Sequence, residues 1–343
     1  MAEQENLTLA ELGESGLLER IAGFAPPGQL DDDAALLAER SGAVLVINTD
    51  MLVEDVHFSE TTMGPADLGW RAAAANLSDL AAMGCREVIG LTVGLVAPAS
   101  TRWSWVEGVY RGLSEALDCH GGHLLGGDCS RGQQRLLAIT ALGRLGAEGA
   151  IRRGDGRPGD RLISTGPHGL SRLGLALLRR EPVLSSISPE LRDLALNAHR
   201  RPVPRLDAVV ALAETRPSGL RWRVGGTDSS DGLAAAVAAI ARTSQCDAEL
   251  DRHALPLAEE MKALGDAEAW CLGGGEDFEL VLALDPSWAA ALLRALPGTV
   301  EIGRLKEKPP EGILSGGTKA TQPVGWSSGE PLLLETDSFG HFQ

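Results

Sequence analysis

Apolar runs rich in Val, Ile and Leu recur along the chain and alternate with alanine-rich segments. The runs are short and predict strands at 43–48, 88–96, 136–142, 162–165, 280–284 and 299–302. The alanine-rich segments carry apolar residues at helical spacing and predict helices at 66–82, 102–117, 169–179, 204–214, 232–242 and 287–295. Strands that alternate with helices in this way indicate an α/β protein.

A charged stretch rich in Gly and Pro, at 152–160, lies near the middle of the chain between two predicted strands. Such a segment is typical of a joint between domains. The length of 343 residues and the apolar content of 44% also favour two domains over one. We therefore expect an N-terminal domain at 1–150 and a C-terminal domain at 151–343.

The chain is strongly acidic, with 47 acidic and 31 basic residues and a formal net charge of -16. This charge repels nucleic acids and anionic membrane surfaces, so neither is expected as a partner. Lysine accounts for only four of the basic residues. A site that handles phosphate would therefore depend on arginine, backbone amides or metal ions.

The N-terminal segment and the cysteines bear on where the protein works. The segment carries glutamates instead of a basic region and an apolar core, and no apolar stretch approaches the 18 residues of a membrane span. The five cysteines are widely spaced, with no Cys-x-x-Cys pair. We expect a soluble protein in the reducing cytoplasm.

Three acidic or amide-bearing groups in the first half lie at the edges of predicted elements. Residues 31–33 are consecutive aspartates, which repel one another unless a cation or solvent relieves them; a solvated turn is the alternative. The sequence 48–50 follows an apolar run, where α/β sheets place ligands. Asn76 and Asp79 are three residues apart and share one face of a predicted, mostly buried helix.

Three further groups combine acidic residues with glycine. Gly126-Gly127-Asp128 lets the backbone approach a phosphate while the carboxylate holds a metal ion, or it is a plain glycine turn. The segment 228–232 precedes an alanine-rich helix, so either Ser230 or Asp231 caps that helix or the segment binds metal and phosphate. Three glycines precede two carboxylates in 273–280, which indicates tight packing around a polar object or a flexible loop.

Taken together, these carboxylates suit hard, oxygen-ligated cations such as Mg²⁺. Each group is a weak signal by itself, because each has an ordinary structural explanation. Several of them in one acidic, lysine-poor chain predict a phosphate site that contains more than one metal ion.

Other motifs fail in their context. The Gly-x-Gly-x-x-Gly match at 154–159 precedes a predicted strand and not a helix, so it predicts no dinucleotide site. The chain has no Walker sequence and none of the protein-kinase signatures. The segment 119–123 holds one Cys and two His among glycines, which is more typical of a helix-ending loop than of a zinc site.

In their order along the chain, the acidic motifs resemble those of the thiamine-monophosphate kinase family. This family belongs to a superfamily with aminoimidazole ribonucleotide synthase, selenophosphate synthetase and a hydrogenase maturation factor. The resemblance covers roughly 28–342 and includes the motifs at 32–35, 49–58, 76–84, 126–128, 153–160, 230–232 and 274–280. It implies two α/β domains with mixed sheets, and an N-terminal domain that forms a barrel-like interface in a homodimer.

The resemblance also implies roles for individual residues. Ligands of several Mg²⁺ ions are implied at Asp33, Asn48, Thr49, Asp50, Asp79, Asp128, Asp228 and Asp231, with Asn48 replacing the usual Ser or Thr. Contacts with ATP are implied at Gly127, Asp128, Arg153 and Ser230. Contacts with thiamine monophosphate are implied at His57, Glu276 and Phe339. Asp31 and the pair Cys129-Ser130 depart from the family pattern.

The implied reaction is transfer of the γ-phosphoryl group of ATP to thiamine monophosphate. The acceptor is itself a phosphate and is largely a dianion at neutral pH, so no general base is needed. The obstacle is repulsion between anions, which cations relieve. His57 is then expected to form a hydrogen bond with the substrate; a satisfied, partly buried histidine is the alternative.

Two other functions stay open at this level. One is a different ATP-dependent enzyme of the superfamily, of the aminoimidazole ribonucleotide synthase type. The other is a non-catalytic protein that binds divalent cations. Selenophosphate synthetase and the hydrogenase maturation factor are disfavoured, because the first cysteine here is Cys85 and the chain given ends in Gln343.

Overall fold

The computed structural model describes residues 7–8, 11–12, 17, 20–24, 44–181, 187–308, 323–330 and 332. These residues form two compact units. Unit 1 contains the described residues up to Leu80, together with Cys85–Gly146 and Arg200–Val203. Unit 2 contains Ala81–Gly84, Ala147–His199 and the described residues from Pro204 onward. Each unit therefore draws on more than one stretch of the chain.

Unit 1 is built on a mixed sheet. In the described residues it has four strands in the order β1-β4-β2-β3. Their bounds are β1 Leu45–Val53, β2 Cys85–Ala97, β3 His123–Arg131 and β4 Leu136–Leu145. Strand β4 pairs antiparallel with β1 and β2, whereas β3 pairs parallel with β2.

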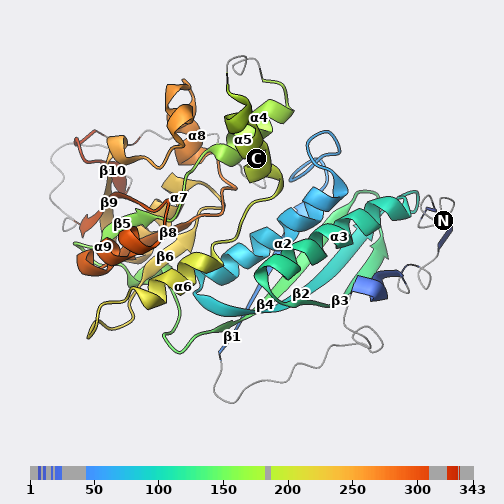
Figure 1. Cartoon of the computed structure of the whole chain (residues 1–343), viewed down its shortest axis with the longest axis horizontal. Helices are drawn as coiled ribbons and strands as arrows, with labels where there is room; N and C mark the ends of the chain where they lie inside the picture. The colour runs from blue at the N-terminus through green and yellow to red at the C-terminus, as the bar shows by residue number, and fades with distance from the viewer. Residues whose placement is uncertain are drawn as a thin grey trace, which may run out of the picture. The chain divides into compact units, whose positions relative to one another are not determined.

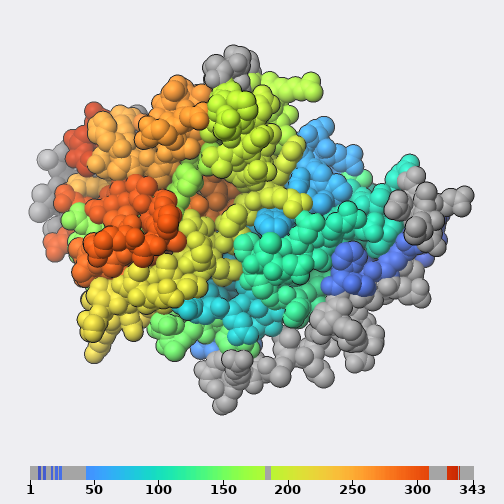
Figure 2. Space-filling view, viewed as in Figure 1, coloured from blue at the N-terminus to red at the C-terminus, as the bar shows by residue number. Residues whose placement is uncertain are grey.

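Helices α2 (Pro65–Ala82) and α3 (Trp103–His120) lie across one face of this sheet (Figure 1). Leu77 of α2, Val109 of α3 and Ile139 of β4 are all 0% exposed. Burial of such side chains stabilises the layer by roughly 25 cal/mol per Å² of apolar surface removed from water. Figure 2 shows the atoms of α3 as the outer surface on this side of unit 1.

The opposite face of the sheet is apolar and accessible along β1. Ile47 is 62% exposed and Met51 is 51% exposed, whereas Leu52 between its neighbours is 5% exposed. This alternation follows from the pleat of a strand, which sends successive side chains to opposite faces. Ile47 and Met51 therefore lie on the face that α2 and α3 do not cover, whereas Leu52 lies on the covered face.

Unit 2 contains a second sheet. In the described residues its order is β10-β7-β9-β5-β8-β6. The bounds are β5 Arg161–Ser164, β6 Gly225–Asp228, β7 Cys246–Leu250, β8 Leu280–Leu284, β9 Val300–Glu307 and β10 Val324–Trp326. The helices after residue 150 are α4 Leu170–Leu178, α5 Pro189–Arg200, α6 Leu206–Glu214, α7 Leu233–Thr243, α8 Ala267–Gly273 and α9 Pro286–Ala295.

Strand β8 shows how unit 2 is layered, because each of its faces packs against a different set of helices. Val281 of β8 packs in a cluster with Val237 of α7, whereas Leu282 packs in a second cluster with Leu212 of α6 and Trp288 of α9. All five residues of β8 are buried. A strand covered on both faces reads as a continuous apolar run, which is what the sequence shows here.

All six predicted strands and all six predicted helices occur, within a few residues of their expected bounds. The prediction of an α/β protein with mixed sheets is therefore confirmed. The elements that the sequence did not predict are β3, β6, β7, β10, α5 and α8. Strands β3 and β6 are rich in Gly and Asp, which have low strand propensity, so neighbouring strands and not local preference place them in their sheets.

Two segments behave as the sequence predicted. After Arg153–Asp155, a short 3-10 helix, the chain enters β5, so no helix opens on the glycine-rich match. Helix α3 ends at His120, and the N–H of Gly121 donates to the carbonyl of Leu117 at 2.7 Å, as in a helix-ending loop. Among the described residues, none of the helices has both the length and the apolar content to cross a bilayer.

Candidate active site

The first group of predicted ligands lies in unit 1, where β1 meets α2. The side-chain amide of Asn48 donates from Nδ2 to Asp79 Oδ2 at 2.8 Å and to Asn76 Oδ1 at 3.2 Å. Asn76 Oδ1 also accepts from the backbone N–H of Asp50 at 3.2 Å. The predicted common face of Asn76 and Asp79 is thus confirmed, and it faces Asn48.

The orientation of Asn48 follows from this network. Both partners of its Nδ2 are acceptors, because Asn76 uses its own Nδ2 to donate to the carbonyl of Ala72 at 2.9 Å. The amide oxygen of Asn48 therefore points away from Asn76 and Asp79. It is buried and has no hydrogen-bond partner among the described residues. A buried acceptor of this kind is costly unless it binds a further group.

Thr49 lies apart from this group. Its hydroxyl pairs with the hydroxyl of Thr140 on β4 at 2.8 Å. Because side chains alternate along a strand, the hydroxyl of Thr49 is on the face opposite to the side chains of Asn48 and Asp50. The structure therefore does not bring the three side chains together.

Gly127 and Asp128 lie in β3 and not in the turn that was the sequence-based alternative. Asp50, Ile139, Val93 and Gly127 occupy one row across the sheet. Three strand spacings separate the ends of this row, or about 14 Å. Asp128, which is exposed, therefore cannot share an ion with Asp50 within one sheet.

Gly127 has a structural reason to be glycine. A Cβ atom at this position would lie 2.0 Å from the carbonyl oxygen of Val93. Any side chain would thus force β3 away from β2. Close packing of the two strands is sufficient to explain the residue, whether or not a phosphate also approaches it.

His57 lies in the turn that follows β1. Its Nδ1 accepts a hydrogen bond from the backbone N–H of Val53 at 3.0 Å. Since a backbone N–H can only donate, Nδ1 is unprotonated and the neutral ring carries its proton on Nε2. His57 thus has a donor on Nε2, as a hydrogen bond to a phosphate or hydroxyl of a substrate would require.

The second group lies in unit 2, between β6 and α7. Asp228 is 5% exposed, and its Oδ1 accepts from the hydroxyl of Ser230 at 3.1 Å. The N-cap of α7 is Gly232, with no side-chain hydrogen bond to the helix. The alternative that Ser230 or Asp231 caps this helix is therefore wrong. Asp231 is exposed beside the buried Asp228.

Arg153 lies in the short 3-10 helix at the start of unit 2. Its Nε donates to the hydroxyl of Thr227 on β6 at 3.1 Å. Because Thr227 and Asp228 are neighbours on β6, this hydrogen bond holds the guanidinium group of Arg153 to the strand that carries the Asp228 carboxylate. The side chain of Arg153 is otherwise exposed.

The glycine-rich segment before β8 packs tightly against the Ser230 turn. The N–H of Glu276 donates to the carbonyl of Ser230 at 2.7 Å. A Cβ atom on Gly275 would lie 2.7 Å from the same carbonyl oxygen. The predicted tight packing is present, against the backbone of the Ser230 turn; the polar object itself stays a prediction.

The carboxylates that follow Glu276 have partners inside unit 2. Asp277 accepts from the backbone N–H groups of Gly169 at 2.7 Å and Ser171 at 2.9 Å. Burial raises the pKa of Asp277 to about 7, while these two hydrogen bonds act in the opposite direction. Glu279 forms an ion pair with Arg205, and burial raises its pKa. Neither carboxylate behaves as a solvated turn residue.

Some predicted residues lie outside the part of the chain that the structure describes. These are Asp33 and Phe339. Among the described residues, no three His, Cys, Asp or Glu side chains gather closely enough to enclose a metal ion. The ligands that the structure does bring together are the mixed amide and carboxylate set around Asn48.

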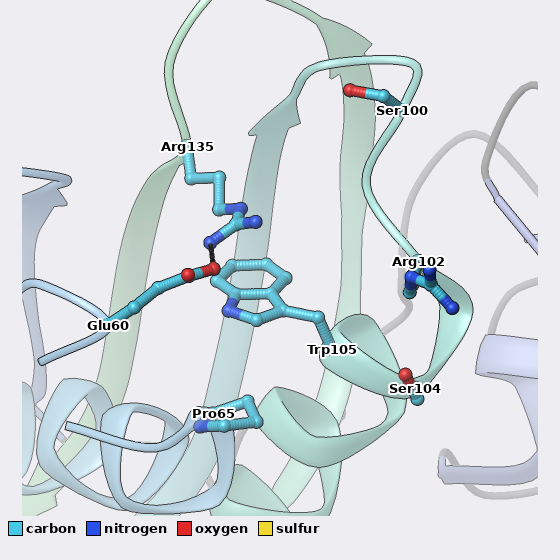
Figure 3. Close-up of a pocket in the computed structure, with 7 residues that line it drawn as sticks. All are labelled: Glu60, Pro65, Ser100, Arg102, Ser104, Trp105 and Arg135. Carbon is cyan, nitrogen blue, oxygen red and sulfur yellow. Dashed lines mark hydrogen bonds and ion pairs between the residues drawn. The ribbon is translucent and has the colours of Figure 1, made fainter. Parts of the chain in front are cut away.

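A cavity of 340 Å³ lies elsewhere in unit 1, and none of the predicted site residues lines it. Figure 3 shows Arg135 extended across Trp105 toward Glu60, with the guanidinium 4.8 Å from the ring centroid. Arg135 also pairs with Glu54 at 3.1 Å. The positive charge of Arg135 is thus balanced by two glutamates of the protein, and ion-paired residues line this cavity.

Two family models match the chain. They are the AIR synthase related protein N-terminal domain, over residues 31–145, and the AIR synthase related protein C-terminal domain, over residues 157–314. The chain is also 48% identical to a thiamine-monophosphate kinase from Prochlorococcus marinus over 347 aligned positions, which cover 100% of both chains. The chain belongs to the thiamine-monophosphate kinase family.

Solved structures agree with membership of this family. The thiamine-monophosphate kinase from Stenotrophomonas maltophilia superposes with a TM-score of 0.72 at 31% identity, covering 85% of this chain and 93% of that chain. AaThiL complexed with AMPPCP and TMP superposes with a TM-score of 0.68 at 29% identity, covering 88% of this chain and 93% of that chain. The prediction of an enzyme of the thiamine-monophosphate kinase family is confirmed.

The thiamine-monophosphate kinase motifs did not reveal every residue that shapes the site. The sequence placed Asn76 on the same helix face as Asp79. Its role as the shared acceptor for Asn48 and Asp50 depends on how α2 packs against β1, which the sequence does not show. Thr227 and Asp277 gave no separate signal. The adjacency of Thr227 to Asp228, and the three glycines before Asp277, are the features that could have drawn attention to them.

Proposed function

We propose that this protein phosphorylates thiamine monophosphate to thiamine diphosphate, by direct in-line transfer of the γ-phosphoryl group of ATP, as the final step of thiamine diphosphate biosynthesis. The observation that carries the proposal is the 48% identity with a thiamine-monophosphate kinase over the full length of both chains. The similarity to AaThiL complexed with AMPPCP and TMP supports it, since AMPPCP is an analogue of ATP.

The acceptor phosphate has a second pKa near 6, so at neutral pH it is mostly ionised and no residue is needed to remove a proton. The geometry of His57 agrees with this, because its Nδ1 is already an acceptor for Val53 N–H. His57 thus serves to donate from Nε2 to the substrate. Its removal is expected to affect substrate binding more than turnover.

Several Mg²⁺ ions are proposed as cofactors, and the residues around Asn48 fit this cation. The unpartnered amide oxygen of Asn48 is a hard ligand, and Asp79 and Asp50 lie on the same side of β1. The wider proposed set includes Asp33, Asp128, Asp228 and Asp231. When bound, these ions would neutralise the anionic charge that keeps the two substrates apart. Thr49 is left out of the proposed set, because its hydroxyl lies on the other face of β1 and pairs with Thr140.

The proposed contacts with ATP are made by Gly127, Asp128, Arg153 and Ser230. Arg153 is held by Thr227 and exposes its guanidinium group, which suits an anionic phosphate. Ser230 donates to Asp228, so its hydroxyl orients a carboxylate that is proposed to bind metal. Asp128 is exposed and lies in the second half of β3, next to Gly127.

The thiamine part of the substrate is proposed to contact Glu276 and Phe339, in addition to His57. Thiamine carries a cationic thiazolium ring and an aminopyrimidine, and a carboxylate and an aromatic face both suit such groups. Glu276 is partly exposed in the tight segment next to the Ser230 turn. This arrangement supports Glu276 as a substrate contact from unit 2.

A homodimer is proposed, with the open face of the unit 1 sheet as its interface. Ile47 and Met51 expose large apolar side chains there. An apolar sheet face of this kind is normally covered in a soluble protein. We place the protein in the cytoplasm, which agrees with the absence of disulfides among its five cysteines.

The deciding experiment supplies the purified protein with Mg²⁺ and ATP and measures thiamine diphosphate formed from thiamine monophosphate. Formylglycinamidine ribonucleotide is tested in parallel with ADP release as the readout, because an enzyme of the aminoimidazole ribonucleotide synthase type would use it. We expect product only from thiamine monophosphate. If the protein binds ATP and Mg²⁺ but forms no ADP in the presence of either acceptor substrate, the result would instead favour a non-catalytic cation-binding protein.

A further inference from the structure

Asp277 is a partly buried carboxylate next to the proposed substrate contact Glu276, and the reaction as described gives it no role. Its Oδ2 accepts from Gly169 N–H at 2.7 Å and its Oδ1 from Ser171 N–H at 2.9 Å. These amides lie at the beginning of α4, which starts at Leu170. Both oxygens of one carboxylate thus fasten the glycine-rich segment to the end of a helix, where the helix dipole favours negative charge.

The backbone on both sides of Asp277 is strained. Glu276 has φ of 61° and Phe278 has φ of 53°, and both lie in the left-handed region that non-glycine residues rarely adopt. Each such residue costs about 1 kcal/mol or more and persists only where the surroundings over-determine it. The two amide bonds of Asp277, placed between these residues, are such a constraint.

The same strained turn fixes where Glu276 is. Its N–H donates to the carbonyl of Ser230 at 2.7 Å, so the left-handed φ of Glu276 is coupled to the turn that carries Asp228 and Asp231. If the Asp277 anchor were lost, rotation about the backbone of Glu276 would relieve the strain. The carboxylate of Glu276 would then lose its fixed direction relative to the Ser230 turn.

We infer that Asp277 is a positioning residue, which holds the strained turn so that the carboxylate of Glu276 faces the cationic part of thiamine monophosphate. The inference rests on the proposed function, because it takes Glu276 to be a substrate contact. Asp277 itself does not touch the substrate and acts through Glu276. We take Glu276 to contact the thiamine part equally in the ground state and in the transition state, so its misplacement should raise KM and leave kcat nearly unchanged.

The chain supplies a matched control in Asp285. This residue also accepts at the beginning of a helix, from Ser287 N–H at 2.9 Å before α9, and it belongs to the same unit. Its φ is −47°, so its backbone is unstrained, and neither neighbour has a positive φ. Asp285→Asn therefore removes a helix cap of the same chemistry without releasing a strained turn.

The test compares Asp277→Asn with Asp285→Asn in the thiamine diphosphate assay. Asn keeps one acceptor but turns an NH₂ group toward one of the two amides. We expect KM for thiamine monophosphate to rise about tenfold in Asp277→Asn, with kcat within about twofold; tenfold corresponds to about 1.4 kcal/mol. KM should change less than about twofold in Asp285→Asn. Equal changes in both variants would overturn the inference, since a general loss of helix capping would then explain them.

A double-mutant cycle with Glu276→Ala separates positioning from other effects. If Asp277 acts through Glu276, Asp277→Asn should raise KM by less than about twofold in the Glu276→Ala background. Two independent, additive increases in KM would overturn the inference. If Asp277→Asn does not fold, Asp277→Ser, which keeps one acceptor, is taken through the same cycle. Failure of the proposed function itself would differ, because the wild-type protein would then form no thiamine diphosphate.

Discussion

The group around Asn48 in unit 1 and the turn around Glu276 in unit 2 hold their polar side chains in different ways. Asn48 and Asp79 lie on a regular strand and a regular helix, with ordinary backbone angles, and Asn76 joins them. Glu276 instead lies in an irregular turn with a left-handed backbone. The first group is positioned by the periodicity of secondary structure, and the second by a few anchoring contacts.

This difference predicts which changes each region tolerates. A regular strand and helix keep their shape when one polar side chain changes, so unit 1 should respond mainly to the loss of charge or ligand atoms. A strained turn depends on its backbone, so unit 2 should respond strongly to added side-chain bulk. We therefore expect substitutions in unit 1 to act through lost charge or ligand atoms, and substitutions in the unit 2 turn to act through backbone strain.

The largest expected effect is on the charge of the proposed metal ligands. Asp79→Asn and Asp128→Asn keep the shape of the side chain but remove its negative charge, so we expect kcat at saturating ATP to fall by about 10²-fold or more. Binding of Mn²⁺, measured by electron paramagnetic resonance, should weaken as well. Asp67→Asn is the control on α2, because Asp67 pairs with Arg201 at 2.7 Å. Near-normal kcat in both ligand variants would contradict the metal-ligand proposal.

The backbone of the unit 2 turn is tested by adding one methyl group. Gly275→Ala adds a Cβ 2.7 Å from the carbonyl oxygen of Ser230 at φ of 66°, whereas Gly298→Ala adds one at φ of 85° with its nearest neighbour 3.9 Å away. Both variants pay for a left-handed alanine, about 1 kcal/mol. We expect Gly275→Ala to lose about 2 kcal/mol more unfolding free energy than Gly298→Ala in urea titrations. Equal losses would mean that the turn is not tightly packed.

The stability of the segment that anchors Asp277 should depend on pH, because a buried histidine lies next to it. His168 precedes Gly169, is 0% exposed, and burial lowers its pKa to about 4 from the ordinary 6.5. As pH falls from 6.5 toward 4, the unfolded chain takes up a proton that the folded protein does not, so this contribution to stability is lost with acid. By pH 5 the loss is about 2 kcal/mol, at about 1.4 kcal/mol per pH unit.

His168→Gln removes this titrating group and keeps a polar side chain of similar size. We expect the fall in unfolding free energy between pH 7 and pH 5 to be about 2 kcal/mol smaller in the variant than in the wild-type protein. Denaturant titrations at the two pH values measure the difference. An identical fall in both proteins would show that His168 is not held neutral by burial.

The smallest expected effect concerns the face of β1 opposite to the proposed metal ligands. Thr49→Val removes the hydroxyl that pairs with Thr140 and leaves the shape of the side chain. Because this hydroxyl lies opposite to Asn48 and Asp50, we expect kcat and the Mg²⁺ requirement to change by less than about twofold. A loss of tenfold or more would show that Thr49 does reach a cation, and that the separation of the two faces is incomplete.

The sequence pattern predicted the fold best for elements that bury one face or both faces. β8 reads as an apolar run because both of its faces are covered, and α2 reads as a helix because its small residues recur at helical spacing. Strands β3 and β6 were not predicted because both contain Gly and Asp, which have low strand propensity. Their places are fixed by pairing with β2 and β8, which are distant in the sequence.

The site was predictable as a set of residues but not as a geometry. Asn76 and Asp79 could be placed on one helix face from their spacing alone, and the structure confirms this. The orientation of the Asn48 amide and the anchoring of Asp277 on α4 depend on contacts between residues far apart in sequence. The opposite faces of Thr49 and Asp50 follow from strand alternation, but only once β1 is known to extend to Val53.

The alternation along β1 has a consequence for how the chain must fold. A slip of one residue in the pairing of β1 with β4 would send every side chain to the other face. Ile47 and Met51 would then point at α2, while Asn48 and Asp50 would enter the proposed subunit interface as buried polar groups. The register of β1 therefore controls both the proposed subunit interface and the proposed cation site.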